Sequence, residues 1–178
     1  MRWKVHGRRP VYTSPWVELW LDDVEVPGGE RFEHHVVRMR PTVVAVVLDD
    51  TAEHCLLLWR HRFITDAWGW EVPGGWVDRD EDPADAVRRE VEEETGWRSG
   101  PLTKLGSWFS MPGICDVRCT LYRAEGATRV GSPTDGAAES TRVGWVSVGD
   151  IRRLIANRQI TDGDTLVALS IALAAPPA

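Results

Sequence analysis

The chain has 178 residues, 43% of them hydrophobic, and 21 basic against 27 acidic side chains give a net charge of −6. This length and apolar content suit one domain of ordinary size, or a domain with an extension. The negative charge argues against a general partner role for nucleic acid or for anionic membranes. It still admits a nucleotide substrate, because a bound metal ion reverses the local field.

The cysteines and the apolar runs indicate the compartment. Cys55, Cys115 and Cys119 form an odd set without the spacing of a disulfide framework or a zinc site. No apolar run is long enough to span a membrane, and the first ten residues lack the apolar core of a signal peptide. We therefore expect reduced thiols in a cytoplasmic protein.

The N-terminal part, residues 11–40, favours β-structure. Two apolar or alternating segments, VELWLDDVEV and RFEHHVVRM, flank a PGGE turn. This pair is either a hairpin of the main sheet or a separate arm.

Two further strands are predicted after a break at Pro41. The segment TVVAVVLDD is a near-continuous apolar run, as expected for a strand buried on both faces, and HCLLLWR should pair with it. Arg60, His61 and Arg62 end the second strand with positive charge. They either solvate the strand end or receive a phosphate.

A helix is predicted over residues 83–95. Asp82 is a suitable cap, Pro83 suits the first helical position, and Gly96 suits a left-handed stop. Glu71 stands further upstream, before a Pro-Gly-Gly turn, where it could contact sugar hydroxyls.

Three carboxylates share one face of this helix. Glu90, Glu93 and Glu94 stand at i, i+3 and i+4, so they repel one another unless a cation lies among them. Hard divalent ions such as Mg²⁺ prefer carboxylate oxygens together with waters or substrate phosphates. The face is therefore either a Mg²⁺ site for phosphate chemistry or a solvated acidic surface.

The remainder of the chain mixes strands and helices. Strands are expected at LTKLGSWFS, VRCTLYRAE and RVGWVSV, and residues 125–141 are expected to be a polar loop. Helical spacing follows in VGDIRRLIANRQI, and a last helix, TDGDTLVALSIALA, has Asp162 or Asp164 as its cap. This order supports an α/β or α+β domain with a mixed sheet.

The region around the acidic helix resembles the signature of the Nudix hydrolases, G-x5-E-x7-R-E-U-x-E-E-x-G-U, where U is a bulky apolar residue. The matching positions are Gly75, Glu81, Arg89, Glu90, Val91, Glu93, Glu94, Gly96 and Trp97. The resemblance implies an α/β fold, the Nudix α/β/α sandwich with a mixed β-sheet, over residues 40–178. Residues 1–39 would be an N-terminal β-extension.

Other segments are similar to the ADP-ribose pyrophosphatase branch, among them LLLWRHRF, WEVPGGWVD and RQITDGDTLVALSIAL. That branch often carries a proline about fifteen residues beyond the signature, and Pro112 stands fifteen residues after Trp97. The branch reads S-P-G-x-x-D-E there, whereas this chain has Met111 before the proline and Val117 after Asp116. These departures leave the substrate open.

The resemblance implies metal-dependent hydrolysis of a nucleoside diphosphate linked to another moiety, with ADP-ribose giving AMP and ribose 5-phosphate. Mg²⁺ or Mn²⁺ would be held by Glu90, Glu94, Glu93 and the Gly74 carbonyl. Arg89 would hold Glu93 in place, Glu81 would support the loop or a second metal, and Gly75 would allow the tight loop. Arg60, Arg62, Glu71 and Pro112 would bind substrate.

The resemblance also suggests a general base and an assembly. In this branch the base is often a glutamate before the penultimate strand, which indicates Glu139, with Asp135 as its competitor. The apolar extension would form a homodimer interface. Two alternatives remain: a Nudix pyrophosphatase acting on another sugar nucleotide, dinucleotide or nucleoside triphosphate, and a non-catalytic module that senses a nucleotide.

Overall fold

The computed structural model describes residues 2–134 and 140–175, with the first two residues of the second range described by backbone alone. The chain forms two compact units. The first comprises Met1–Pro41 and Phe109–Arg118, and the second comprises Thr42–Trp108 and Cys119–Ala178. The boundary after Pro41 lies two residues beyond the one expected from the sequence.

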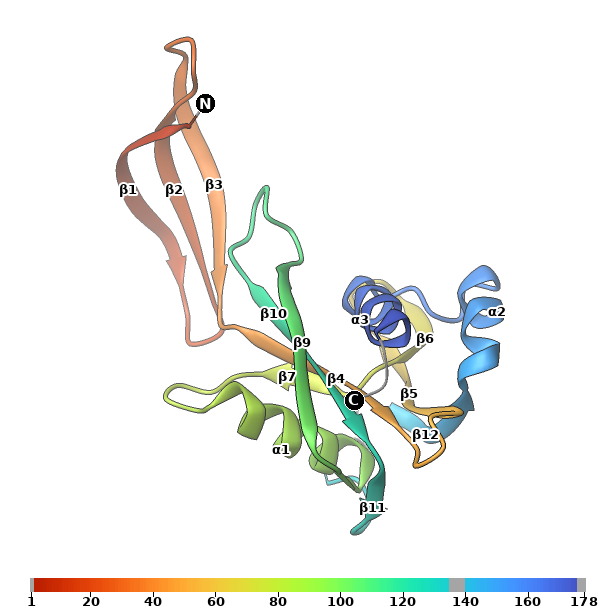
Figure 1. Cartoon of the computed structure of the whole chain (residues 1–178). Coiled ribbons are helices and arrows are strands. Elements are labelled where there is room, and N and C mark those ends of the chain that lie inside the picture. Colours follow the sequence, from red (N-terminus) through yellow and green to blue (C-terminus); the bar gives the residue numbers. More distant parts are fainter. Residues whose placement is uncertain (1, 135–139, 176–178) are drawn as a thin grey trace. The chain divides into compact units, whose positions relative to one another are not determined.

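The N-terminal unit is an antiparallel sheet of three strands, in the order β1 (Lys4–Thr13), β2 (Val17–Glu25) and β3 (Arg31–Met39) (Figure 1). The expected hairpin is β2–β3, and it carries the register Trp20↔Val36. Strand β1 was not predicted from the sequence. Its sequence, KVHGRRPVYT, is exposed at every position. Because the strand has no buried face, its residues do not alternate between apolar and polar in the way that predicts a strand.

Residues 109–118 complete this unit, although they follow β3 by about seventy positions. The Val37 N–H donates to the Ile114 carbonyl at 2.8 Å, and Val37 and Cys115 form a parallel bridge. Arg38 and Asp116 form an ion pair at 2.9 Å. The loop therefore extends the edge of β3.

The second unit contains a mixed seven-stranded sheet with the main order β12-β5-β4-β10-β9. Its strands are β4 (Thr42–Leu48), β5 (His54–Arg62), β6 (Ala67–Glu71), β7 (Gly74–Trp76), β9 (Leu102–Phe109), β10 (Arg118–Glu125) and β12 (Ser140–Ser147). Strand β4 runs parallel to β10 and antiparallel to β7. The expected pairing of β4 with β5 is limited to Leu48↔Cys55, because β5 pairs mainly with β6 and β12.

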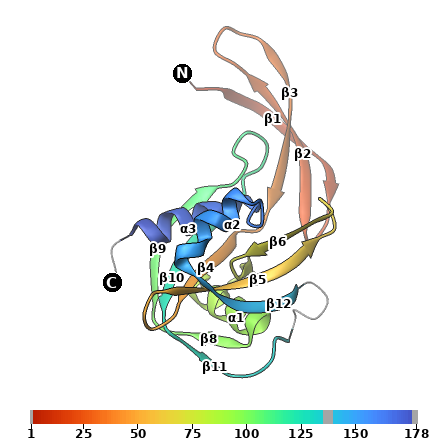
Figure 2. The ribbon, with the colours of Figure 1, turned by 90° about the vertical axis from the view of Figure 1, so that its right-hand side faces the viewer.

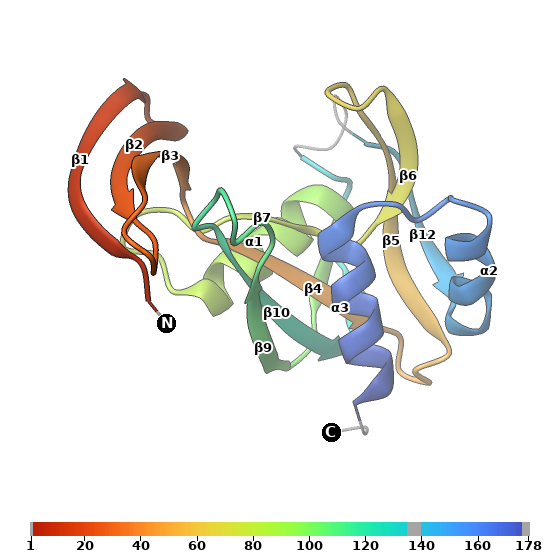
Figure 3. The same ribbon diagram turned by 90° about the horizontal axis from the view of Figure 1, so that it is seen from above.

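Strand β4 is buried on both faces, as its apolar run predicts. Val44, Val46 and Leu48 enter one core, whereas Val43, Ala45 and Val47 enter the other. Helix α1 (Pro83–Thr95) covers the second core, and α2 (Ile151–Ala156) and α3 (Gly163–Ala174) cover the first. Figures 2 and 3 show these helices on opposite faces of the sheet, so the expected α/β/α sandwich is confirmed.

The helix ends follow the predicted signals. The Asp82 carboxylate caps α1 by accepting from the Ala84 N–H at 2.7 Å, and Gly96 closes the helix with φ of 73°. Asp162, not Asp164, caps α3 through the Thr165 N–H at 2.7 Å. A short 3-10 turn, η1 (Val148–Asp150), precedes α2. None of the helices in the described ranges is long and apolar enough to cross a membrane.

The expected polar loop 125–141 is wrong at its start. Residues Ala127–Arg129 form β11, which pairs with β8 (Trp97–Ser99) in a small separate sheet. The following backbone lies against the end of α1, since the Thr134 N–H donates to the Glu93 carbonyl at 2.8 Å. The pairing of β11 depends on a strand thirty residues earlier, so its own composition does not reveal it.

Candidate functional site

Helix α1 is oriented by its apolar face. Ala86, Val87 and Val91 are fully buried in the core, whereas Glu90 and Glu93 lie off that apolar face and are partly exposed. Glu94 lies between the two faces and is buried. The three acids expected from the spacing therefore occupy environments of different polarity.

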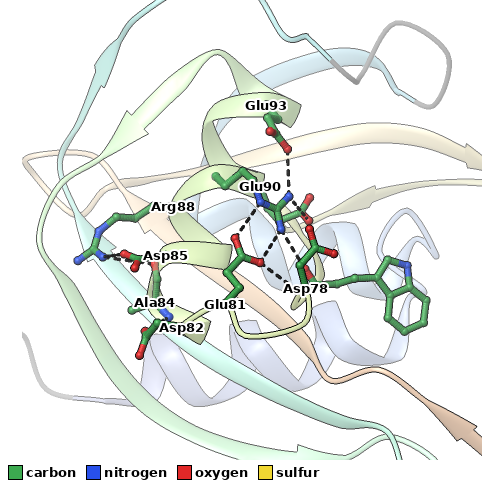
Figure 4. Close-up of polar contacts among 10 residues, drawn as sticks. Asp78, Glu81, Asp82, Ala84, Asp85, Arg88, Glu90 and Glu93 are labelled. Atoms are coloured by element: carbon green, nitrogen blue, oxygen red, sulfur yellow. Dashed lines mark hydrogen bonds and ion pairs between the residues drawn. The ribbon is translucent and has the colours of Figure 1, made fainter. Parts of the chain in front are cut away.

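Arg89 joins the carboxylates of Glu81, Glu90 and Glu93 into one acidic cluster. Figure 4 shows how these three glutamates lie. The Arg89 guanidinium donates to both carboxylate oxygens of Glu81 at 3.0 Å, to Glu90 at 2.8 Å and to Glu93 at 3.1 Å. It also donates to the Trp76 carbonyl at 3.1 Å. These contacts raise the pKa of the Arg89 guanidinium, with the Glu81 hydrogen bond as the largest cause, so its charge is permanent.

Glu81 ties the loop before α1 to this arginine. Its second carboxylate oxygen accepts from the Asp78 N–H at 3.0 Å, and its own N–H donates to the Asp78 carbonyl at 3.2 Å. The hydrogen bond from Arg89 lowers the pKa of the Glu81 carboxyl. Glu81 thus supports the loop, which is one of the two roles expected for it.

Gly75 lies directly against the Glu90 carboxylate. A Cβ at this position would come within 2.5 Å of the Glu90 carboxylate, so a side chain here would displace it. Burial raises the pKa of the Glu90 carboxyl, and the neighbouring Glu94 and Glu93 charges add to the effect against the opposing pull of Arg89. Negative charge at Glu90 is therefore held at a cost that a further cation would relieve.

Glu94 is held from two sides. One carboxylate oxygen is paired with a terminal nitrogen of Arg60, and the other accepts from the Gly74 N–H at 2.9 Å. Burial raises the pKa of the Glu94 carboxyl, although Arg60 and the Gly74 N–H favour its charged form. Sequence reasoning missed this pairing of Arg60 with Glu94, because it joins β5 to α1 across the fold and no local pattern signals it.

The two arginines at the end of β5 differ in exposure. The side chain of Arg60 is 3% exposed, whereas that of Arg62 is 50% exposed. Arg62 donates to Glu71 at 2.6 Å, and the Nε of Arg60 lies 3.9 Å from the same carboxylate. Glu71, expected to meet sugar hydroxyls, is buried between the two cations.

The other predicted site residues lie elsewhere. Pro112 belongs to the loop of the N-terminal unit, whereas the glutamates belong to the second unit. Glu139 and Asp135 lie outside the described residues. Within the described ranges, no three acids, histidines or cysteines converge closely enough to hold a metal ion as they stand. The guanidiniums of Arg89 and Arg60 lie among the carboxylates instead.

Comparison with known proteins places this geometry in a family. The family model of the NUDIX domain matches residues 38–166. A CMP-5'-(N-acetyl-N-hydroxy-3-aminopropyl)phosphonate hydrolase from Streptomyces rubellomurinus is 40% identical over 172 residues, which are 96% of this chain and 82% of that protein. The chain belongs to the Nudix family.

A second relative and a solved structure extend the comparison. The ADP-ribose pyrophosphatase of Bacillus subtilis is 25% identical over 93% of this chain and 90% of its own length. The crystal structure of an ADP compounds hydrolase superposes with a TM-score of 0.81 at 18% identity, and covers 97% of this chain and 93% of that one. The resemblance to the Nudix family near the ADP-ribose branch is thus confirmed.

Proposed function

We propose that the chain is a metal-dependent hydrolase of a nucleoside 5'-phosphate joined to a second phosphorus-bearing group. The observation that carries this proposal is the acidic cluster of α1 in a chain of the Nudix family: Glu90 lies against Gly75, Glu94 accepts from the Gly74 N–H, and Arg89 joins Glu90 to Glu93. The water oxygen bonds to one phosphorus, the bond from that phosphorus to its bridging oxygen breaks, and the leaving group departs with that oxygen.

The charge of the cluster fits a divalent cation. Glu81, Glu90, Glu93 and Glu94 bring four negative charges when ionised, and the two guanidiniums paired with them bring two positive charges, which leaves two negative charges uncompensated. The donors are carboxylate oxygens, which Mg²⁺ and Mn²⁺ prefer. We assign Glu90, Glu94, Glu93 and the Gly74 carbonyl as the groups that would hold the ion.

A bound ion would neutralise the diphosphate, polarise its phosphoryl oxygens and lower the pKa of a bound water. The protein supplies the arrangement around it. Arg89 holds Glu90 and Glu93 in fixed positions, and the absence of a side chain at Gly75 leaves the space that Glu90 occupies. We keep Glu139 as the proposed general base on its sequence position before β12.

Two substrates lead the proposal. ADP-ribose, which would give AMP and ribose 5-phosphate, follows from the likeness to the ADP-ribose branch. A CMP-linked phosphonate is the second candidate, because the relative named for hydrolysing such a compound is 40% identical over 96% of the chain. Both contain a nucleotide attached through phosphorus, so one acidic site suits either.

A product analysis separates these candidates. The protein is incubated with Mg²⁺ in ¹⁸O-water in three parallel reactions, which contain ADP-ribose, a CMP-linked alkylphosphonate or ATP. The products of each reaction are identified by mass. We expect a nucleoside monophosphate and its partner product, with one ¹⁸O atom on one of them. Substrate recovered intact in every reaction, with either Mg²⁺ or Mn²⁺, would contradict the proposed hydrolysis and favour a sensing module.

A homodimer is also proposed, from the apolar surface of the N-terminal unit. Its exposed large apolar side chains include Trp3, Val5, Val11, Tyr12, Trp16 and Phe32. Exposed large apolar side chains that gather on one unit are a feature of interaction sites. A partner copy would meet it with two-fold symmetry.

A further inference from the structure

We infer that Arg60 is a positioning residue that fixes the Glu94 carboxylate, and that Glu71 supplies a second carboxylate beside the Arg60 guanidinium. This inference deepens the proposed function and rests on it, because it concerns how one glutamate of the acidic face is oriented. It replaces the expectation that Arg60 receives a substrate phosphate.

A substrate has little access to Arg60. Arg60 is 3% exposed, so a substrate phosphate reaches it only if the surrounding side chains move away. Arg62, two residues further along the same face of β5, is 50% exposed and pairs with Glu71. Of the two arginines, only Arg62 offers a surface to a ligand in this conformation.

The geometry at Glu94 favours a positioning role for Arg60. Each of its carboxylate oxygens has a different partner, Arg60 on one and the Gly74 N–H on the other. Two donors on opposite oxygens fix the plane of a carboxylate, since rotation about its terminal bond would break both contacts. The direction in which the remaining lone pairs point is then set by β5 and β7, not by solvent.

The balance of buried charge supports the same role. Arg60 lies between Glu94 and Glu71, and its Nε atom has no hydrogen-bond partner among the residues that the structure describes. A buried guanidinium remains charged, so it needs both carboxylates nearby. The order Arg62–Glu71–Arg60–Glu94 thus alternates in sign from the surface to the acidic face.

A kinetic double-mutant cycle tests the inference on the full chain. Arg60→Gln and Arg60→Lys are each made in the parent chain and in the Glu94→Gln variant. The kcat and KM of all variants are measured with the substrate that the product analysis identifies. We expect Arg60→Gln to lower kcat by about 10- to 100-fold, the usual cost of losing a partner of a metal ligand, with KM little changed. Arg60→Lys should restore part of this loss. In Glu94→Gln the Arg60 change should add almost nothing, because the group it orients is already gone.

The matched control is Arg98→Gln, which breaks the exposed Arg98–Glu92 pair on α1 and β8 and should leave kcat and KM unchanged. A raised KM with unchanged kcat in Arg60→Gln, or equal losses with and without Glu94, would overturn the inference and indicate a substrate contact.

A second cycle is independent of turnover. The melting temperatures of the same variants are measured in EDTA, and Mg²⁺ is titrated calorimetrically into the folded ones. Arg60→Gln and Glu94→Gln should lower the melting temperature non-additively, and both should alter Mg²⁺ binding. Additive shifts in melting temperature would overturn the inference even if no substrate were found. Non-additive shifts in a protein without turnover would support the Arg60–Glu94 contact and contradict only the proposed function.

Discussion

At the scale of single residues, Glu90 and Glu94 have the same charge but different partners. Arg89 contacts Glu90 and keeps Glu81 and Glu93 when Glu90 is neutralised. Arg60, by contrast, has one carboxylate in close contact among the described residues, that of Glu94, and Glu71 lies 3.9 Å away. The helical spacing predicts simple repulsion among the acids, whereas the structure makes one of them half of a buried ion pair.

Glu90→Gln and Glu94→Gln should therefore separate stability from activity. Both should reduce hydrolysis by orders of magnitude if they hold the metal ion. In metal-free protein, Glu90→Gln should be neutral or slightly stabilising, because it removes a charge that burial opposes. Glu94→Gln should cost about 3–5 kcal/mol, because it leaves a buried guanidinium without its close counter-ion. Urea unfolding in EDTA measures both, and equal effects on stability would contradict this difference.

Glu139 remains a prediction from sequence position. A general base contributes about 10²- to 10⁴-fold, so Glu139→Gln should lower kcat within that range and leave Mg²⁺ affinity unchanged. Rates of the two variants Glu139→Gln and Asp135→Asn are compared at saturating substrate. A larger loss in Asp135→Asn would transfer the assignment to Asp135.

The buried thiols make stability sensitive to alkali. Burial raises the pKa of both Cys55 and Cys119 from 9.0 to about 12. The unfolded chain therefore loses these protons first, so stability is retained below pH 9 and falls as the pH rises from 9 toward 12. At pH 10 the two thiols together should cost roughly 2–3 kcal/mol relative to pH 8. Urea unfolding at both pH values measures the loss, and the Cys55→Ala/Cys119→Ala variant should lose less. An equal loss in that variant would count against this origin.

At the scale of elements, the two glycines of β7 serve different purposes. A Cβ on Gly74 would meet the Val43 carbonyl at 2.2 Å and the Val44 backbone at 2.8 Å, both in β4. The three atoms nearest to a Cβ on Gly75 would all belong to the carboxylate of Glu90. Backbone cannot yield without opening the sheet, whereas a carboxylate can rotate away.

Gly74→Ala should thus lower the melting temperature strongly, and Gly75→Ala should lower activity while the fold persists. Gly106→Ala is the matched control, since a Cβ there has nothing within 4 Å. Circular dichroism melting and initial rates are measured on all three variants. Full activity in Gly75→Ala would mean that Glu90 does not need its present position.

The elements also show how far sequence reasoning reaches. Helix α1 and strand β4 were predictable because their caps and apolar runs are local signals. Strands β1 and β11 were missed because their pairing partners, and not their own patterns, make them strands. The acidic face was predictable from i, i+3 and i+4 spacing, but the Arg60 contact joins residues 34 positions apart and needed the fold.

At the scale of the whole molecule, the proposed homodimer is open to direct measurement. Light scattering of the full chain at micromolar concentration should give twice the 20.0 kDa of one chain. The apolar surface of the N-terminal unit provides the reason, because Trp16 alone is 64% exposed. A mass of one chain would rule the dimer out. Deleting residues 1–39 is a less clean test, since it also removes the strand on which the 109–118 loop is anchored.

That anchoring has a consequence for synthesis on the ribosome. Val37 finds its partner at Cys115, which is translated 78 residues later. At a translation rate of roughly 5–20 residues per second, the loop that extends the edge of β3 is synthesised about 4–16 seconds after β3 itself. During this interval the emerging chain presents an uncovered strand edge, the feature that invites pairing with another nascent chain. Factors that shield nascent chains would therefore matter most for this protein between the completion of β3 and the emergence of the loop.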